Sequence, residues 1–279
     1  RRRHTRFRNV TGVQTCALPI FDSSHYGLVL EAARQLKGWS DGRLAVDPLL
    51  AALDRITREK KANSRDARSE ILQRLKEFAD VRVVSGLRSY VADFDPAIAK
   101  LAADILSDNI GTKVEPSTTR YATKPVPDET YINGLIGATA VIKMKDAGPF
   151  TMELIPEEAP VTVALFAKLA ESNYYKGLTL HRIVPNFVLQ GGSPGASEYV
   201  GNADFNRDEI GLLSHKRGTL GISTRGRDTG DMQIFINLID NYRLDHAYTV
   251  FARITVGMDN VDKIQEGDVI ESVEIHRKR

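Results

Sequence analysis

The stretch Leu180-His-Arg-Ile-Val-Pro-Asn-Phe-Val-Leu-Gln-Gly-Gly192 places one permanent cation, Arg182, inside an apolar run. A charge among apolar residues is costly unless another group pairs with it or uses it. Phe187 and Gln190 follow it, and two glycines then lead into a loop. Alternate side chains of a straight strand share a face, but Pro185-Asn186 interrupts the register. Two interpretations stay open: an edge strand whose arginine reaches water, or a site that uses the cation.

Length and composition bound the remaining possibilities. The chain has 279 residues, which predicts about two domains. Its 42% hydrophobic and 27% charged residues are ordinary for a globular protein. No apolar run reaches the roughly 18 residues of a membrane helix, so no membrane span is expected. Removing the five arginines of residues 1–20 from the net charge of +2 leaves −3, which argues against nucleic-acid binding.

Residues 1–20 are predicted to be a non-native or disordered tail. The run Val10–Ile20 resembles translated sequencing-adapter sequence. A basic arm for nucleic acid is an alternative, whereas a signal peptide would need a longer apolar region. If the adapter interpretation holds, the native N-terminus and any targeting signal are missing. Cys16 is the only cysteine, so neither an intrachain disulfide nor a cysteine metal cluster can form. The compartment, cytoplasm or bacterial periplasm, is therefore left open.

Residues 21–110 show helical periodicity. Apolar residues recur at spacings of three and four, which predicts about five amphipathic helices in antiparallel pairs. Asp47-Pro48 and Asp95-Pro96 are typical of helix starts, with aspartate as the N-cap and proline at the first helical position. Trp39, the lone tryptophan, is expected to anchor helices to one another.

Asp93-Phe94-Asp95-Pro96, with the alanines and leucines that follow it, resembles a HEAT-type repeat. Arrays of such repeats often present a surface to a partner, so a protein partner through the helical domain is one expectation. The alternative is a helical domain that only packs on its neighbour.

Residues 111–133 hold three prolines and few large apolar residues, which predicts a semi-extended linker. In residues 134–279 the period changes to two, as in half-buried strands. Many short strands with only two helices indicate a closed antiparallel barrel, which leaves no exposed edge. The expected segments are strands at 140–144, 150–154, 218–222, 233–237, 248–254 and near 273–275, with helices from 160 and around 258–264.

The barrel half contains none of the usual catalytic sets. It has no Gly-x-Ser-x-Gly elbow and no phosphate-binding glycine loop. The six histidines of the chain show no metal-ligand spacing, and Asp228 and Asp231 fit solvated loop acids as well as a cation site. No cofactor and no metal are therefore expected.

Three ordered motifs in this half resemble the cyclophilins, the peptidyl-prolyl cis-trans isomerases. The first is His181–Gly192, which contains Arg182 and Gln190; the second is Gly218–Ile236; the third is Leu244–Phe251. The similarity covers about half of the chain. The amino-acid sequence at 243–251 is most similar to that of bacterial members of the family. It implies an eight-stranded barrel capped by two helices, with the site on the outer face.

The resemblance also implies roles for individual residues. Arg182 would direct its guanidinium at the proline nitrogen, and Gln190 would position Arg182 and the peptide. The substrate-binding residues would be Phe187, Val188, Phe235 and Leu244 in the proline pocket, Thr224 through its backbone, Gln233 along the groove, and Tyr248 at the position of a frequent pocket histidine. Proline-containing polypeptides would be the clients.

The chemistry of proline isomerisation fits these residue types. The peptide C–N bond resists rotation by about 18–20 kcal/mol because the nitrogen lone pair is delocalised. A cation near that nitrogen favours a localised lone pair and so stabilises the twisted state selectively. No nucleophile is needed. Other hypotheses are a proline-peptide binding module or chaperone with little turnover, and a scaffold whose main role lies in the helical half.

Several positions depart from the family pattern. Val188 stands where methionine is common, Ile234 replaces a phenylalanine, and Arg243 replaces a tryptophan. Ser223-Thr224 replaces the usual Ala-Asn pair, which puts its side-chain contacts in doubt but leaves the backbone contacts intact.

Overall fold

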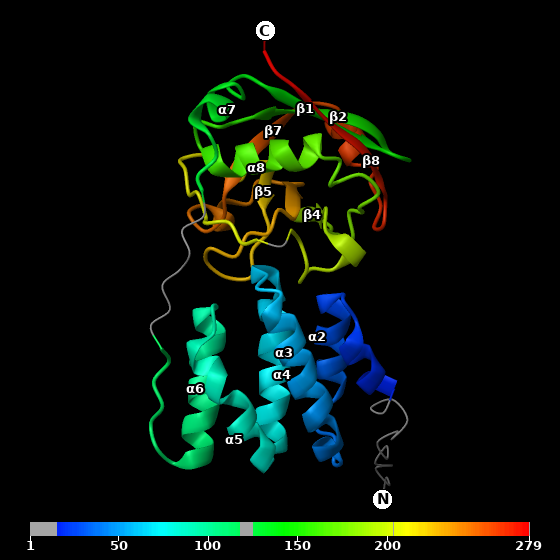
Figure 1. The fold of residues 1–279 in the computed structure, drawn as a ribbon. Helices are drawn as coiled ribbons and strands as arrows, with labels where there is room; N and C mark the ends of the chain where they lie inside the picture. The colour runs from blue at the N-terminus through cyan, green and yellow to red at the C-terminus, as the bar shows by residue number, and fades with distance from the viewer. Residues whose placement is uncertain (1–15, 118–124, 203, 279) are drawn as a thin grey trace, which may run out of the picture. The chain divides into compact units, whose positions relative to one another are not determined.

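The computed structural model describes residues 16–117, 125–202 and 204–278. The chain divides into two compact units, residues 1–122 and 123–279. Figure 1 shows helices in the first unit and a strongly curved sheet with its helices in the second. The predicted helical region and the predicted antiparallel strand region are both present.

The described part of the first unit contains five α-helices between residues 26 and 110, as the periodicity predicts. Their bounds are α2 Tyr26–Gln35, α3 Val46–Arg58, α4 Arg65–Phe78, α5 Val81–Leu87 and α6 Pro96–Ile110. Helix α4 contacts α2, α3 and α6. Each helix buries an apolar stripe, and Trp39 is buried among them at 5% exposure.

Only one of the two predicted aspartate caps is found. Asp95 precedes α6, and its Oδ1 accepts from the amide of Ala97 at 2.9 Å, with Pro96 at the first helical position. Asp47 is not a cap, because α3 begins one residue earlier and directly continues a 3-10 helix, Gly42–Ala45. The helical backbone before α3 leaves no extended residue that could act as an N-cap.

A buried ion pair joins α4 to the segment before α6. Arg68 is fully buried, and its Nη1 donates to both carboxylate oxygens of Asp93 at 2.8 Å. Arg65 donates through Nε to Asp95 at 2.6 Å. The ring of Phe94 lies 4.4 Å from the guanidinium carbon of Arg68. The Asp93–Asp95 motif is thus a tether between helices.

Two predicted segments differ from their expectation where the structure describes them. Residues 1–15 of the predicted tail lie outside the described residues, but Leu18–Asp22 forms a 3-10 helix and Ala17 is buried. Residues 118–124 of the predicted linker also lie outside. Its last residues form helix α7, Glu129–Asn133, which Asp128 caps by accepting from the amide of Thr130. The linker prolines end at Pro127, so nothing prevents a helix there.

The second unit is built on one eight-stranded antiparallel sheet. Its strands are β1 Thr139–Met144, β2 Gly148–Leu154, β3 Arg182–Val184, β4 Val188–Gly191, β5 Thr219–Ile222, β6 Ile234–Asn237, β7 Val250–Val256 and β8 Ile270–His276. The order is β3-β4-β6-β5-β7-β2-β1-β8. Helices α8 (Pro160–Glu171) and α9 (Met258–Val261) contribute residues such as Phe166 and Val261 to the core.

The prediction of a closed barrel is wrong at one seam, where the sheet stays an open half-barrel. Strands β3 and β8 are the two ends of the order and do not pair with each other. The irregular segment just before β3 instead meets the start of β8 and the residues before it: Leu180 donates its amide to the carbonyl of Asp268, and Ile270, the first residue of β8, donates its amide to the carbonyl of Leu178. These hydrogen bonds satisfy part of the exposed edge, so the strands themselves need not close.

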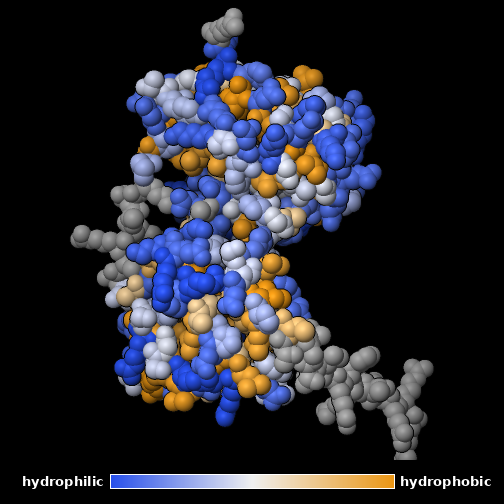
Figure 2. All heavy atoms as spheres, turned by 45° about the vertical axis from the view of Figure 1, so that its right-hand side comes forward, coloured by the Kyte–Doolittle hydropathy of each residue, from blue (hydrophilic) through white to orange (hydrophobic). Residues whose placement is uncertain are grey.

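The polar surface is typical of a chain with most large apolar side chains inside. On the face in Figure 2, each unit shows mainly hydrophilic residues with apolar ones scattered among them. Among the described residues, no helix is both long enough and apolar enough to cross a bilayer.

Candidate active site

The motif that contains Arg182 folds as a tight hairpin between β3 and β4. Asn186 adopts a left-handed conformation with φ +56°, which asparagine tolerates better than most residues. The turn sets Arg182 directly opposite Gln190 in the antiparallel register. Residues directly opposite each other share a face. The interruption at Pro185-Asn186 therefore brings the cation and the amide together.

The same face continues across the sheet as one row. Gln190 on β4 pairs with Phe235 on β6, and Phe235 pairs with Gly221 on β5. Val188 lies two residues before Gln190 on the same strand and so shares its face. The opposite face of these strands, represented by Leu189, belongs to the hydrophobic core. Single strands thus supply core residues and site residues alternately.

A polar network surrounds Arg182. Its Nη1 donates to Oε1 of Gln190 at 3.0 Å. The Nε2 of Gln190 donates to the hydroxyl of Ser223 at 2.9 Å and lies 3.5 Å from Oε1 of Gln233. The Nε of Arg182 lies 3.1 Å from a carboxylate oxygen of Glu198. Arg182 is 37% exposed while Gln190 is buried, so the guanidinium is anchored from inside and open to solvent.

An aromatic cluster lies beside this network. The ring of Phe235 stacks on His215 at 5.6 Å and meets Tyr248 edge to face at 5.9 Å. Gly221 makes room for it, because a Cβ there would lie 2.4 Å from Cζ of Phe235. Burial lowers the pKa of His215 below its usual value, which favours the neutral imidazole. The cluster is an apolar wall without a permanent charge.

Phe187 lies in the turn of the hairpin, and a second turn faces it. The guanidinium of Arg243 lies 4.2 Å from the centre of the Phe187 ring. Asn241 donates its side-chain amide to the carbonyl of Phe187 at 3.0 Å. Asn241 also precedes the short 3-10 helix Tyr242–Leu244, so this contact ties the half-buried Leu244 to the hairpin.

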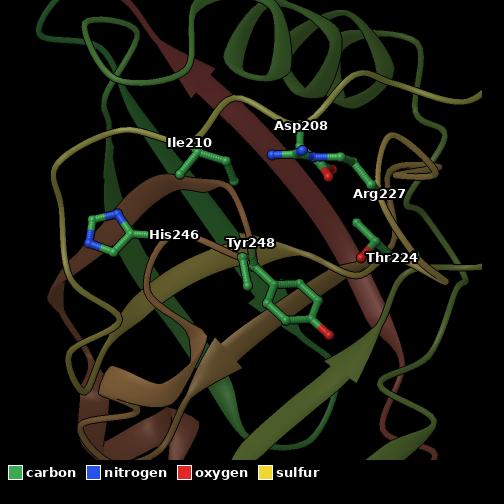
Figure 3. Close-up of a pocket in the computed structure, with 8 residues that line it drawn as sticks. Asp208, Ile210, Thr224, Arg227, His246 and Tyr248 are labelled. Atoms are coloured by element: carbon green, nitrogen blue, oxygen red, sulfur yellow. The ribbon is translucent and has the colours of Figure 1, made fainter.

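Thr224 and Tyr248 line a neighbouring pocket of about 340 Å³. Figure 3 shows Tyr248 between Thr224 on one side and His246 on the other, with Arg227 beside Asp208. Burial raises the pKa of the Asp208 carboxyl. Thr224 and Tyr248, both predicted from the sequence, therefore border this pocket, and Tyr248 also contacts Phe235.

The structure thus brings together eight of the nine predicted residues in three adjoining groups, and the ninth, Thr224, lines the pocket that Tyr248 borders. Arg182, Gln190 and Gln233 form the polar network; Phe235 and Tyr248 form the aromatic wall; Phe187, Val188 and Leu244 belong to the hairpin and the turn that faces it. Sequence reasoning did not assign His215, Ser223 or Glu198 to the site. Ser223 stood out only as a departure from the family pattern, and an exposed loop acid such as Glu198 carries no signal in a sequence.

The arrangement offers a hydrogen-bonded cation beside an apolar wall. A cation held by an amide can interact with an amide nitrogen, and an apolar wall can receive a small ring. Among the described residues, no group of three histidine, cysteine or acidic side chains could hold a metal ion.

Comparisons with known proteins find one family and several similar proteins. The family model described as "Cyclophilin type peptidyl-prolyl cis-trans isomerase/CLD" matches residues 139–278. A peptidyl-prolyl cis-trans isomerase of Helicobacter pylori is 39% identical over 140 residues, which cover 49% of this chain and 85% of that protein. Peptidyl-prolyl cis-trans isomerase B of Bacillus subtilis is 36% identical over 139 residues, which cover 49% of this chain and 97% of that protein. A crystal structure of a cyclophilin-type peptidyl-prolyl cis-trans isomerase from Cryptosporidium parvum has a TM-score of 0.47 and 23% sequence identity. The match covers 50% of this chain and 98% of that one.

The matched residues include every residue of the polar network and of the aromatic wall. The match covers 85% of the Helicobacter pylori protein and 97% of the Bacillus subtilis protein. The chain therefore belongs to the cyclophilin-type family and is a peptidyl-prolyl cis-trans isomerase.

Proposed function

We propose that Arg182 is the catalytic cation of this isomerase and that Gln190 holds it in place. The observation that carries the proposal is the cross-strand pairing of these two residues, with Nη1 of Arg182 3.0 Å from Oε1 of Gln190. Gln190 is itself fixed by Ser223 at 2.9 Å. The guanidinium is thus oriented before a substrate arrives, and no free energy is spent on orienting it during the reaction.

The proline ring of the client would lie against the apolar side of the site. Phe235, buried and braced by His215 and Tyr248, would form the floor of the pocket. Phe187, Val188 and Leu244 would complete its walls. With the ring held there, the guanidinium of Arg182 would approach the proline nitrogen and stabilise its localised lone pair in the twisted state.

The flanking peptide would bind along the loop and strand that follow. The backbone of Thr224 would hydrogen-bond the client chain, and Gln233 would lie beside it. Tyr248 would separate the proline pocket from the cavity of about 340 Å³. Clients would be polypeptides with an accessible X–Pro bond.

The helical unit would recruit or orient clients as a HEAT-like array, and its domain would span residues 21–110, joined by the linker 111–133 to the isomerase domain 134–279. Support comes from helix α4, which contacts α2, α3 and α6, and from the buried tether at Asp93. Partner binding through this unit should persist in an isomerase-dead variant.

Arg182→Ala in the full chain tests the catalytic proposal. Removing one preorganised donor should lower kcat/KM about 10²–10³-fold, measured by exchange NMR on a short Xaa-Pro peptide. The matched control is Arg253→Ala, since Arg253 pairs with Glu153 on an exposed part of the sheet. Peptide binding with no turnover in the unmodified protein would favour a recognition module. Unchanged turnover in Arg182→Ala would contradict the proposal.

A further inference from the structure

Glu198 lies in the loop after β4 and contacts the proposed catalytic cation. Its Oε1 is 3.1 Å from Nε of Arg182, while its side chain remains 47% exposed. An exposed ion pair by itself is worth little, because water and salt screen it. This pair differs from an ordinary exposed ion pair because other side chains hold the backbone of Glu198 in place.

The backbone of Glu198 is fixed by two side chains of the loop and strand around Gln233. Its carbonyl accepts from Nε2 of Gln233 at 3.1 Å and from Nη1 of Arg225 at 3.0 Å. Arg225 is in turn anchored on the fully buried Asp231 at 2.8 Å. Glu198 is therefore held by buried groups, although its own side chain reaches solvent.

These contacts close a ring of four residues. Arg182 donates to Gln190, Gln190 donates to Gln233, and Gln233 donates to the backbone of Glu198. The carboxylate of Glu198 then returns to Arg182. Two different nitrogens of Arg182, Nη1 and Nε, are held, which fixes the plane of the guanidinium as well as its position. Neither contact uses Nη2.

We propose that Glu198 is a positioning residue for isomerisation: it holds Arg182 through Nε so that Nη2 is presented to the proline nitrogen. This inference rests on the proposed role of Arg182. Gln190 alone would leave the guanidinium free to swing about the Nη1 contact. A misplacement of this kind lowers the population of the productive geometry and so lowers the rate of the bound substrate rather than its affinity.

The carboxylate also has an effect that opposes catalysis, because its negative charge weakens the positive field of Arg182. A negative charge 3.1 Å from Nε reduces the field of Arg182 at the substrate. Removing Glu198 would then raise turnover. Glutamine at this position separates the two effects, because its amide oxygen still accepts from Nε but carries no charge.

The experiment compares Glu198→Ala, Glu198→Gln and Arg182→Ala in the full chain. Exchange NMR over a range of Xaa-Pro peptide concentrations gives kcat and KM separately, and the Nε–H signal of Arg182 reports its hydrogen bond. Glu153→Ala is the matched control, since Glu153 also pairs with an exposed arginine but lies outside the ring.

Glu198→Ala should lower kcat about tenfold with KM within about twofold, and the Arg182 Nε–H should exchange faster with water. Glu198→Gln should restore kcat to within about threefold of the unmodified protein, and Glu153→Ala should change nothing. Unchanged or raised kcat in Glu198→Ala, or a glutamine variant as slow as the alanine one, would overturn the inference. Full activity in Arg182→Ala would instead refute the proposed function on which it rests.

Discussion

Replacing Arg68 by methionine removes the buried guanidinium of the helical unit while keeping an unbranched apolar stem. The Asp93 carboxylate, 1% exposed, then loses a partner that donates to both of its oxygens at 2.8 Å. Asp95, 3% exposed, would keep its contact with Arg65. Removing one member of a buried pair typically costs about 3–5 kcal/mol, because the remaining charge stays buried without its opposite charge; Asp93 would keep the hydrogen bond from the amide of Asp95. We expect the free energy of unfolding of this unit to fall by that amount.

The lone tryptophan makes the measurement specific to this unit. Trp39 is buried at 5% exposure within it, so its fluorescence during urea unfolding follows the helices and not the sheet. The shift of the urea midpoint at constant slope gives the change in stability. Isomerase activity without denaturant should stay at its normal level.

Two variants test the cause. Lys100→Met removes one member of an exposed pair with Asp104 and should cost less than about 1 kcal/mol. Arg68→Met combined with Asp93→Asn removes both buried charges and should recover part of the lost stability. A loss below about 1 kcal/mol in Arg68→Met alone would refute the argument, as would a double variant less stable than the single one.

The buried imidazole and the glycine under the aromatic wall give two further predictions. Burial lowers the pKa of His215, so its stabilising contribution is complete above about 6.5 and is lost as the pH falls toward the folded value. A histidine NMR titration should place its midpoint below 6.5, as for His181, and a midpoint at or above 6.5 would contradict the burial argument. Gly221→Ala should destabilise the second unit by about 1–3 kcal/mol and lower kcat/KM, since its Cβ would lie 2.4 Å from the Phe235 ring. Thermal unfolding and the peptide assay check this; Gly134→Ala, with nothing nearer than 3.4 Å, is the control, and equal effects of both substitutions would count against the steric cause.

Periodicity located most elements because burial acts on side chains locally. The alternation around Phe150 and the stripe from Pro160 correspond to β2 and α8. The two aspartates differ because Asp95 has an extended backbone and can cap α6, whereas Asp47 already lies inside α3. The local sequence of the two Asp-Pro pairs does not show that difference.

The residue pattern alone did not supply the parts of the site that depend on strand register, and only the family resemblance related Gln190 to Arg182. The facing of Arg182 relative to Gln190 follows from the left-handed turn at Asn186, which a count of positions cannot supply. The prediction of a closed barrel was wrong for a similar reason, because closure depends on which segments of the chain meet at the seam. Glu198 is placed by hydrogen bonds to its backbone, and backbone contacts leave no mark in a pattern of side chains.

Core residues and site residues alternate along the same strands, so the geometry of the site depends on the same strand register as the core. Leu189, whose side chain packs into the core, is the immediate neighbour of Gln190, and Ile236 is the neighbour of Phe235. Strand β4 cannot shift by one residue without exposing its core side chain and turning Gln190 inward. The free energy that fixes the register of the core side chains therefore also fixes the register of the proposed site. If Arg182 acts as proposed, the surface around it stays fixed and the rotation takes place in the X–Pro bond of the client.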